Sequence, residues 1–105
     1  MLKYEVNLEI NADIVGDYLA WLKPHIKKIL GLEGFVKAEL LIDRLDDTAG
    51  VKKITVAYYL KDFKSYEEYI RCHATAMRDE GLARFQGLFS AQRRVLEIDT
   101  TFNAL

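Results

Sequence analysis

The opening segment of the chain alternates strictly between apolar and polar side chains. Residues 2–10 read LKYEVNLEI, so every second residue from Leu2 onward is apolar and those between are polar. Because successive side chains of a strand point to opposite faces, this period predicts a half-buried strand. We therefore expect a sheet with one face in the core and the other in contact with water.

A helix is expected directly after this strand. Asn11 or Asp13 can cap it, and the apolar residues within 14–30 fall on one broad arc of a helix. Pro24 lies inside this segment, and proline removes a backbone donor and clashes with the preceding turn. We therefore predict a kink or a break near this proline, then a short helical piece that stops at Gly31.

Residues 35–60 are typical of a hairpin. Two apolar segments, 35–45 and 51–60, flank the turn sequence DDTAG. The residues expected to face inward are Val36, Ala38, Leu40 and Ile42 on the first strand and Ile54, Val56, Tyr58 and Leu60 on the second.

A second helix and a last strand complete the pattern. Ser65 with Glu68 three residues later forms a capping box, which predicts a helix that runs to about Glu80 before Gly81. Residues 89–98 are expected to form a strand. Its phase is ambiguous, because adjacent Val95 and Leu96 compete for the inward side, and a bulge would resolve the conflict.

The expected order is strand, helix, strand, strand, helix, strand. This is the split βαβ arrangement of ferredoxin-like α+β folds, with both helices on one face of a four-stranded antiparallel sheet. We expect a single domain over residues 1–98 and a C-terminal tail over 99–105. The opposite sheet face is mostly polar, yet Leu41, Ala57 and Tyr59 leave room for a partner sheet.

Composition excludes several classes of protein. The 105 residues carry 15 basic and 16 acidic side chains, so we expect neither a nucleic-acid partner nor an anionic membrane surface. We find no signal-peptide pattern and no segment long enough to span a bilayer, and a cytosolic location is the default. Cys72 is the single cysteine, which excludes a disulfide within the chain.

Two histidines are expected to point toward the covered sheet face. At 100° per residue, His73 shares the arc of Tyr69 and Met77, and His25 shares that of Trp21. In one interpretation both are core residues, hydrogen-bonded to inward tyrosines such as Tyr4, Tyr58 or Tyr69. In the other, both line a pocket whose apolar wall is formed by Trp21, Tyr58 and Met77.

The residues favour neither a metal nor a cofactor. Two histidines could ligate a metal, but no inward carboxylate is evident, and Glu80 lies about 10 Å from His73 along the helix axis. Glycine-rich phosphate loops and hydrolase or metalloprotease motifs are absent from the sequence. We therefore expect no metal site and no cofactor.

One stretch carries a resemblance to a known family. It is HATAMRDEGLARFQGLFSAQRRVLEI, residues 73–98, in which the matching positions are His73-Ala74, Met77-Arg78, Leu82-Ala83-Arg84-Phe85, Phe89, Arg93 and Leu96-Glu97. Trp21 with His25 four later, and Tyr4-x-Val6, add weaker support. The chain resembles a small stand-alone family of unknown function that adopts the dimeric α+β-barrel, ferredoxin-like fold.

The resemblance implies a fold and a homodimer but no activity. Relatives by architecture include cofactor-independent monooxygenases and haem-degrading enzymes, whose amide-rich site has no counterpart here, since Asn7 is expected to face away from the helices. Gly81 and Gln92 stand where the family usually has bulkier residues, which bears on the shape of the pocket mouth.

The function predicted is therefore that of a cytosolic homodimer which binds a small organic molecule between helices and sheet. The expected contacts are His25, Trp21, Tyr58, His73, Met77, Arg78 and Arg93, with either arginine as an anion contact at the mouth. Whether the protein is an enzyme stays open; were it one, His73 would be the general acid or base. The alternatives are a non-enzymatic dimerisation module with a closed core and, less favoured, a cofactor-independent monooxygenase-like enzyme.

Overall fold

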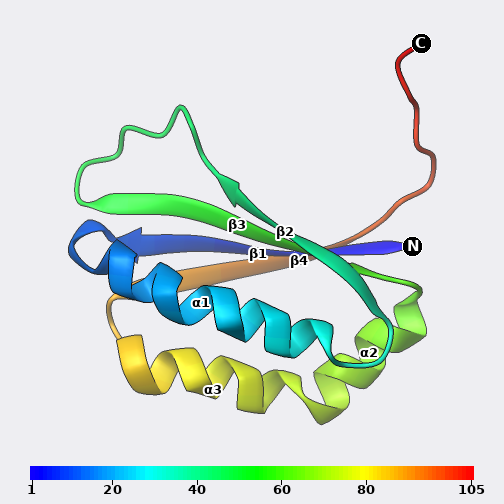
Figure 1. Ribbon diagram of the computed structural model, residues 1–105, viewed down its shortest axis with the longest axis horizontal. Coiled ribbons are helices and arrows are strands. Elements are labelled where there is room, and N and C mark those ends of the chain that lie inside the picture. The colour runs from blue at the N-terminus through cyan, green and yellow to red at the C-terminus, as the bar shows by residue number, and fades with distance from the viewer.

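Four antiparallel strands form one sheet, and every helix lies on the same face of it (Figure 1). The computed structural model describes all 105 residues. Its elements are β1 (Leu2–Asn11), the 3-10 turn η1 (Ala12–Ile14), α1 (Val15–Leu30), β2 (Phe35–Ile42), β3 (Val51–Leu60), α2 (Phe63–Cys72), α3 (Ala74–Phe85) and β4 (Phe89–Glu97). The strand order is β2-β3-β1-β4, so the expected ferredoxin-like α+β fold is confirmed.

Strand β1 is the centre of the sheet, as its alternation predicts. It pairs along its whole length with β3 on one side and from Leu2 to Ile10 with β4 on the other. Its apolar residues form the floor of the core, where Ile10 is fully buried and Leu8 is 4% exposed. The sequence period of two therefore identified both the strand and its buried face.

The inward residues of the hairpin agree with the prediction except at Val36 and, at the end of β2, Ile42. A bulge between Phe35 and Lys37 shifts the register at the start of β2. The extra residue turns Val36 outward, where it is 52% exposed, and Phe35 packs against the core instead. Ile42 pairs with Ile54 at the far end of β2 but is 47% exposed.

Strand β4 has no bulge, so its ambiguous phase is resolved in another way. It pairs with β1 in one continuous register, which sets Val95 opposite Tyr4. Val95 packs against the core, and Leu96 lies on the other face and is 37% exposed. The neighbouring central strand thus decides the phase that the sequence left ambiguous.

Helix α1 runs without a break through Pro24, so of the predicted kink or break, the break is wrong. Pro24 and Ala20, the residue whose carbonyl loses its usual helical donor, both have exposed side chains. Water on this side can hydrogen-bond that carbonyl. The buried side of the helix, with Tyr18, Leu22 and Ile29, packs both halves against the core.

The second helical segment differs most from the prediction. Asp62, not Ser65, is the N-cap of α2, since its carboxylate accepts hydrogen bonds from Ser65 N at 2.8 Å and Ser65 Oγ at 2.7 Å. The helix ends at His73, whose φ of −131° and ψ of −29° depart from helical values. A new helix, α3, then continues through Gly81 to Phe85.

One glycine is required by a close approach of two segments. Gly34, between α1 and β2, has a φ of 89°, and a Cβ there would lie 2.3 Å from Ser65 Cβ. The turn therefore packs its backbone directly against the first turn of α2. This contact fixes where α2 begins relative to the sheet.

The second face of the sheet carries no helix, and the chain ends on that side of the molecule (Figure 1). Residues 98–105, after β4, form neither helix nor strand. No helix combines the length and the apolar character that a bilayer crossing needs.

Candidate functional site

A cavity of about 280 Å³ lies between the sheet and the helices. Hydrophobic residues account for 14 of the 19 that line it. The lining residues are Tyr4, Val6, Leu8, Tyr18, Trp21, Leu22, His25, Ile29, Val56, Tyr58, Tyr69, Met77, Arg78, Gly81, Leu82, Phe89, Ser90, Ala91 and Arg93. A concave, mostly apolar space with a few polar groups is the usual form of a small-molecule site.

The cavity brings together all but one of the residues expected to line a site. The six that line it are Trp21, His25, Tyr58, Met77, Arg78 and Arg93. His73 is not among the lining residues, so its expected place in the cavity wall is wrong. The break between α2 and α3 falls at His73 itself, and helical phasing across a break does not hold.

His25 is the histidine of the site, and its partner is a carboxylate. Its Nδ1 lies 3.0 Å from Glu80 Oε2, and its ring stacks on Trp21 with centroids 4.5 Å apart. Lys28 also donates to Glu80. Burial lowers the pKa of His25 from its ordinary value by more than the negative charge of Glu80 raises it, so the neutral imidazole is favoured.

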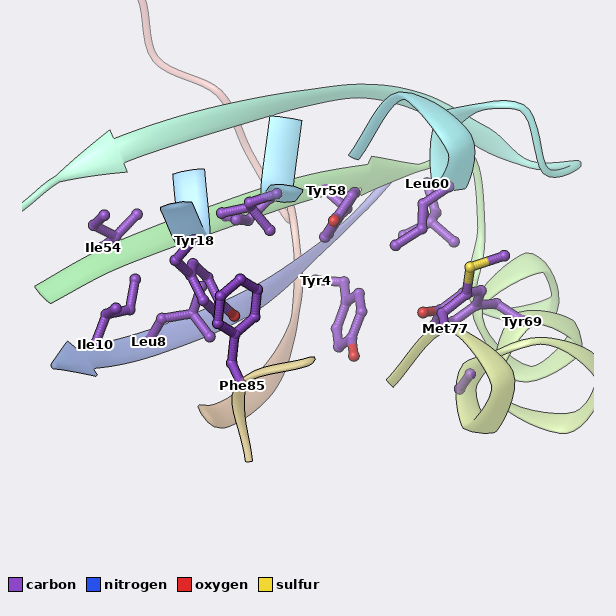
Figure 2. Close-up of a cluster of buried hydrophobic side chains, with 14 of the residues drawn as sticks. Tyr4, Leu8, Ile10, Tyr18, Ile54, Tyr58, Leu60, Tyr69, Met77 and Phe85 are labelled. Atoms are coloured by element: carbon purple, nitrogen blue, oxygen red, sulfur yellow. The ribbon is translucent and has the colours of Figure 1, made fainter. Parts of the chain in front are cut away.

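The tyrosines of the core pack with one another and do not hydrogen-bond either histidine. Tyr4 and Tyr58 project from neighbouring strands toward the helices, between Tyr18 at one end and Tyr69 at the other (Figure 2). The Tyr4 ring centroid lies 5.9 Å from that of Tyr58 and 6.0 Å from that of Tyr69. Burial raises the pKa of Tyr18 and of Tyr69 to about 12, so these phenols stay neutral at physiological pH.

Two arginines supply the positive charge of the cavity. Arg78, on α3, donates from Nη2 to Tyr4 Oη at 3.2 Å, and its Nε is buried without a hydrogen-bond partner in the chain. Arg93 lies on β4 opposite Val6, on the helix-covered side of the sheet. The lining contains no aspartate and no glutamate.

Gly81 shapes the cavity where α3 crosses Trp21. A Cβ at this position would lie 3.0 Å from Trp21 Cη2 and 3.6 Å from Phe89 Cζ. A larger residue would therefore push the indole or fill the space. Gln92, the other position expected to affect the pocket mouth, pairs with Asn7 on the opposite sheet face and does not line the cavity.

The other candidate groups lie apart from the cavity. The structure contains no cluster of three or more His, Cys, Asp or Glu side chains that could hold a metal ion. Cys72 is exposed, with its Sγ 3.6 Å from Glu68 Oε1. Asn7 accepts a hydrogen bond from Thr55 Oγ1 at 2.7 Å and lies on the helix-free face, as expected.

Sequence reasoning missed Glu80 as part of the site, whereas Gly81 was expected to affect the pocket mouth. Glu80 was expected to lie along the helix from His73, whereas it faces His25 across two helices. The sequence does show an acidic residue, Glu80, next to a glycine within a helical segment. Whether these two residues face His25 and Trp21 depends on how α1 and α3 align. That alignment is a tertiary property.

The family model for a domain of unknown function, DUF4286, matches residues 1–98. The chain belongs to this family. The expected membership of a small family of unknown function is thereby confirmed. No curated protein matches the sequence.

Solved structures share the fold of this DUF4286 chain at low sequence identity. The haem-degrader MhuD from Mycobacterium tuberculosis, with two haems bound in its active site, is 12% identical with a TM-score of 0.69, covering 98% of this chain and 100% of its own. An antibiotic biosynthesis monooxygenase is 14% identical with a TM-score of 0.66 over 92% and 97% of the two chains. SnoaB from Streptomyces nogalater, a cofactor-independent oxygenase, is 17% identical with a TM-score of 0.64 over 98% of each chain.

Proposed function

We propose that this DUF4286 domain is a homodimer that binds a small organic molecule in the cavity between sheet and helices. The observation that carries the proposal is the cavity itself, about 280 Å³ in volume and walled mainly by apolar side chains. The space is concave and partly open to solvent, so a small molecule can enter it. A bound apolar molecule would remove the lining side chains from water.

The competing interpretation is a dimerisation module with a closed core. Such a module needs no internal space, and it gives no role to charged side chains that line one. The cavity and its two arginines therefore favour ligand binding over simple packing.

The oxygenases of similar fold suggest a second function, catalysis in the same cavity. His25 is the residue that favours it, because an imidazole held by a carboxylate at 3.0 Å is arranged to act as a general base. This role replaces the one expected of His73. Haem is a poor fit, since the cavity is only about twice the ~150 Å³ that accommodates benzene.

A thermal-shift screen of aromatic and aliphatic small molecules tests the binding proposal. A ligand at 100 times its Kd stabilises the native state by about 2.7 kcal/mol, which is readily detected as a rise in Tm. The control is Gly81→Val, because its side chain would enter the space next to Trp21 and should abolish the shift. A screen without hits, or equal shifts in the variant, would favour the dimerisation module.

A further inference from the structure

The cavity has a positive charge that the chain itself does not neutralise. Arg78 and Arg93 line it, neither forms an ion pair with a carboxylate, and no acidic residue is part of the wall. Arg93 is exposed and stays hydrated, whereas Arg78 is partly buried, where an unpaired charge is less favourable. An anion in the cavity would be a partner for both groups.

Arg78 has a donor that is buried and unused. Its Nη2 bonds Tyr4 Oη at 3.2 Å, but its Nε is shielded from solvent and has no hydrogen-bond partner in the chain. Nε is enclosed by the protein, whereas Nη1, which also forms no hydrogen bond within the chain, is not buried and can meet an acceptor in the cavity. The guanidinium fork matches the two oxygens of a carboxylate.

Arg93 reaches the same end of the cavity from the sheet. It projects from β4, in the same inward phase as Ala91 and Val95. Val6, the residue opposite Arg93, lies two positions along β1 from Tyr4, whose hydroxyl accepts from Arg78 Nη2. Both arginines therefore line the cavity close to Tyr4.

The remaining wall is suited to flat aromatic rings. Seven of the lining side chains carry an aromatic ring: Tyr4, Tyr18, Trp21, His25, Tyr58, Tyr69 and Phe89. Rings pack well against other rings in offset and edge-on arrangements. The volume of about 280 Å³ is nearly twice the ~150 Å³ of a cavity that holds one benzene ring, so there is room for two fused rings.

We propose that the ligand is a planar aromatic carboxylate of about two rings, whose carboxylate is bound by Arg78 and Arg93. This inference rests on the proposed function, because it specifies the occupant of the same cavity. The ring system lies among the aromatic side chains near Trp21 and Tyr58, and the charge lies at the arginine end.

Naphthoate and its neutral amide, naphthamide, test the proposal by isothermal titration calorimetry. They share size and shape and differ in charge, so the wild-type protein should bind naphthoate at least tenfold more tightly, as expected for a charge-assisted pair. Arg78→Gln and Arg93→Gln should each reduce that preference to threefold or less. Arg44→Gln is the matched control, since Arg44 lies in the β2–β3 loop, away from the cavity, and should retain the full preference.

The outcomes separate the two proposals. If both probes bind equally well, the anion inference is wrong and the proposed ligand-binding function stands. If neither binds, the binding function fails as well, for a molecule of the size that this cavity holds. Should Arg78→Gln fail to fold by circular dichroism, Arg93→Gln on the exposed edge strand decides, and an unchanged preference there overturns the inference.

Discussion

His25 is the residue that links the stability of this protein to its candidate site. Its side chain is 9% exposed, stacked on Trp21 and held by Glu80 of the neighbouring helix. Burial is the largest effect on its pKa and lowers it. The folded protein therefore resists protonation at this position more than the unfolded chain does.

Stability should fall as the pH is lowered from 7 to 5. The unfolded chain gains a proton on His25 near pH 6.5, the folded protein only at a lower pH, and the state that binds more protons is favoured by acid. Urea unfolding of His25→Gln at pH 7 and pH 5 should show a smaller loss than the wild type. His73→Gln is the control, since the His73 side chain makes no hydrogen bond at its helix end. If both substitutions reduced the pH-dependent loss of stability equally, His25 would not be its cause.

Two helical glycines provide a matched test of crowding in the cavity wall. A Cβ on Gly16 would meet nothing within 4 Å, so Gly16→Ala should stabilise the protein by up to about 1 kcal/mol through helix propensity. Gly81→Ala should lose this gain, because the new methyl lies 3.0 Å from Trp21. Denaturant unfolding measures the free energy of unfolding of both variants. An equal gain in stability at the two positions would mean that the Trp21 indole moves aside without an energetic cost.

At the scale of elements, two features determine where α2 begins: the N-cap residue Asp62 and the close contact between Ser65 and Gly34. Asp62 accepts from both the backbone and the hydroxyl of Ser65, and Ser65 itself packs against Gly34. Glu68, expected to complete a capping box, pairs with Arg71 instead. These contacts transfer the capping role from Ser65 to Asp62.

Asp62→Ala should therefore destabilise the protein by about 1 kcal/mol, the usual effect of losing an N-cap. Glu68→Gln is the comparison, and its exposed ion pair predicts a change within about 0.5 kcal/mol. Both values come from urea titrations at pH 7. A larger loss of stability for Glu68→Gln than for Asp62→Ala would indicate that the capping box, and not Asp62, stabilises the start of α2.

At the scale of the whole molecule, the two faces of the sheet differ in kind. The helices cover one face, while the other carries polar networks such as Glu5 with Lys3 and Arg94, and Tyr59 with Glu39. Glu5 is only 6% exposed and Ala57 is fully buried on that open face. Arg94 and Lys3 hold the pKa of Glu5 below its usual value. The carboxylate on this face is therefore charged, and its charge is balanced by neighbouring cations of the same chain.

We expect this face to pair with its counterpart in a second copy. Light scattering at tens of micromolar should give twice the 12.1 kDa mass of the chain. Leu41→Asp, at a position 42% exposed on the open face, should give the monomer mass. Leu45→Asp, in the β2–β3 loop and 91% exposed, should leave the dimer intact; a monomeric wild type would contradict the prediction.

Local sequence determined the positions of the strands and of the first helix, and the buried side of β1 and α1. The alternation of residues 2–10 and the apolar arc of residues 14–30 are properties of neighbouring residues, so they are visible without the fold. Together with the short connections between elements, they were sufficient for the ferredoxin-like topology. Of the seven residues expected to contact a ligand, six line one cavity.

Tertiary packing decided which residues from distant parts of the sequence come into contact. The helix ends at His73 although residues 69–77 contain neither glycine nor proline, and the break allows Tyr69 and Met77 to pack from two helices of different direction. His25 meets Glu80 across 55 residues, and Gly81 matters only because Trp21 crosses it. Such contacts depend on how whole elements align, and periodicity within one element carries no information about that alignment.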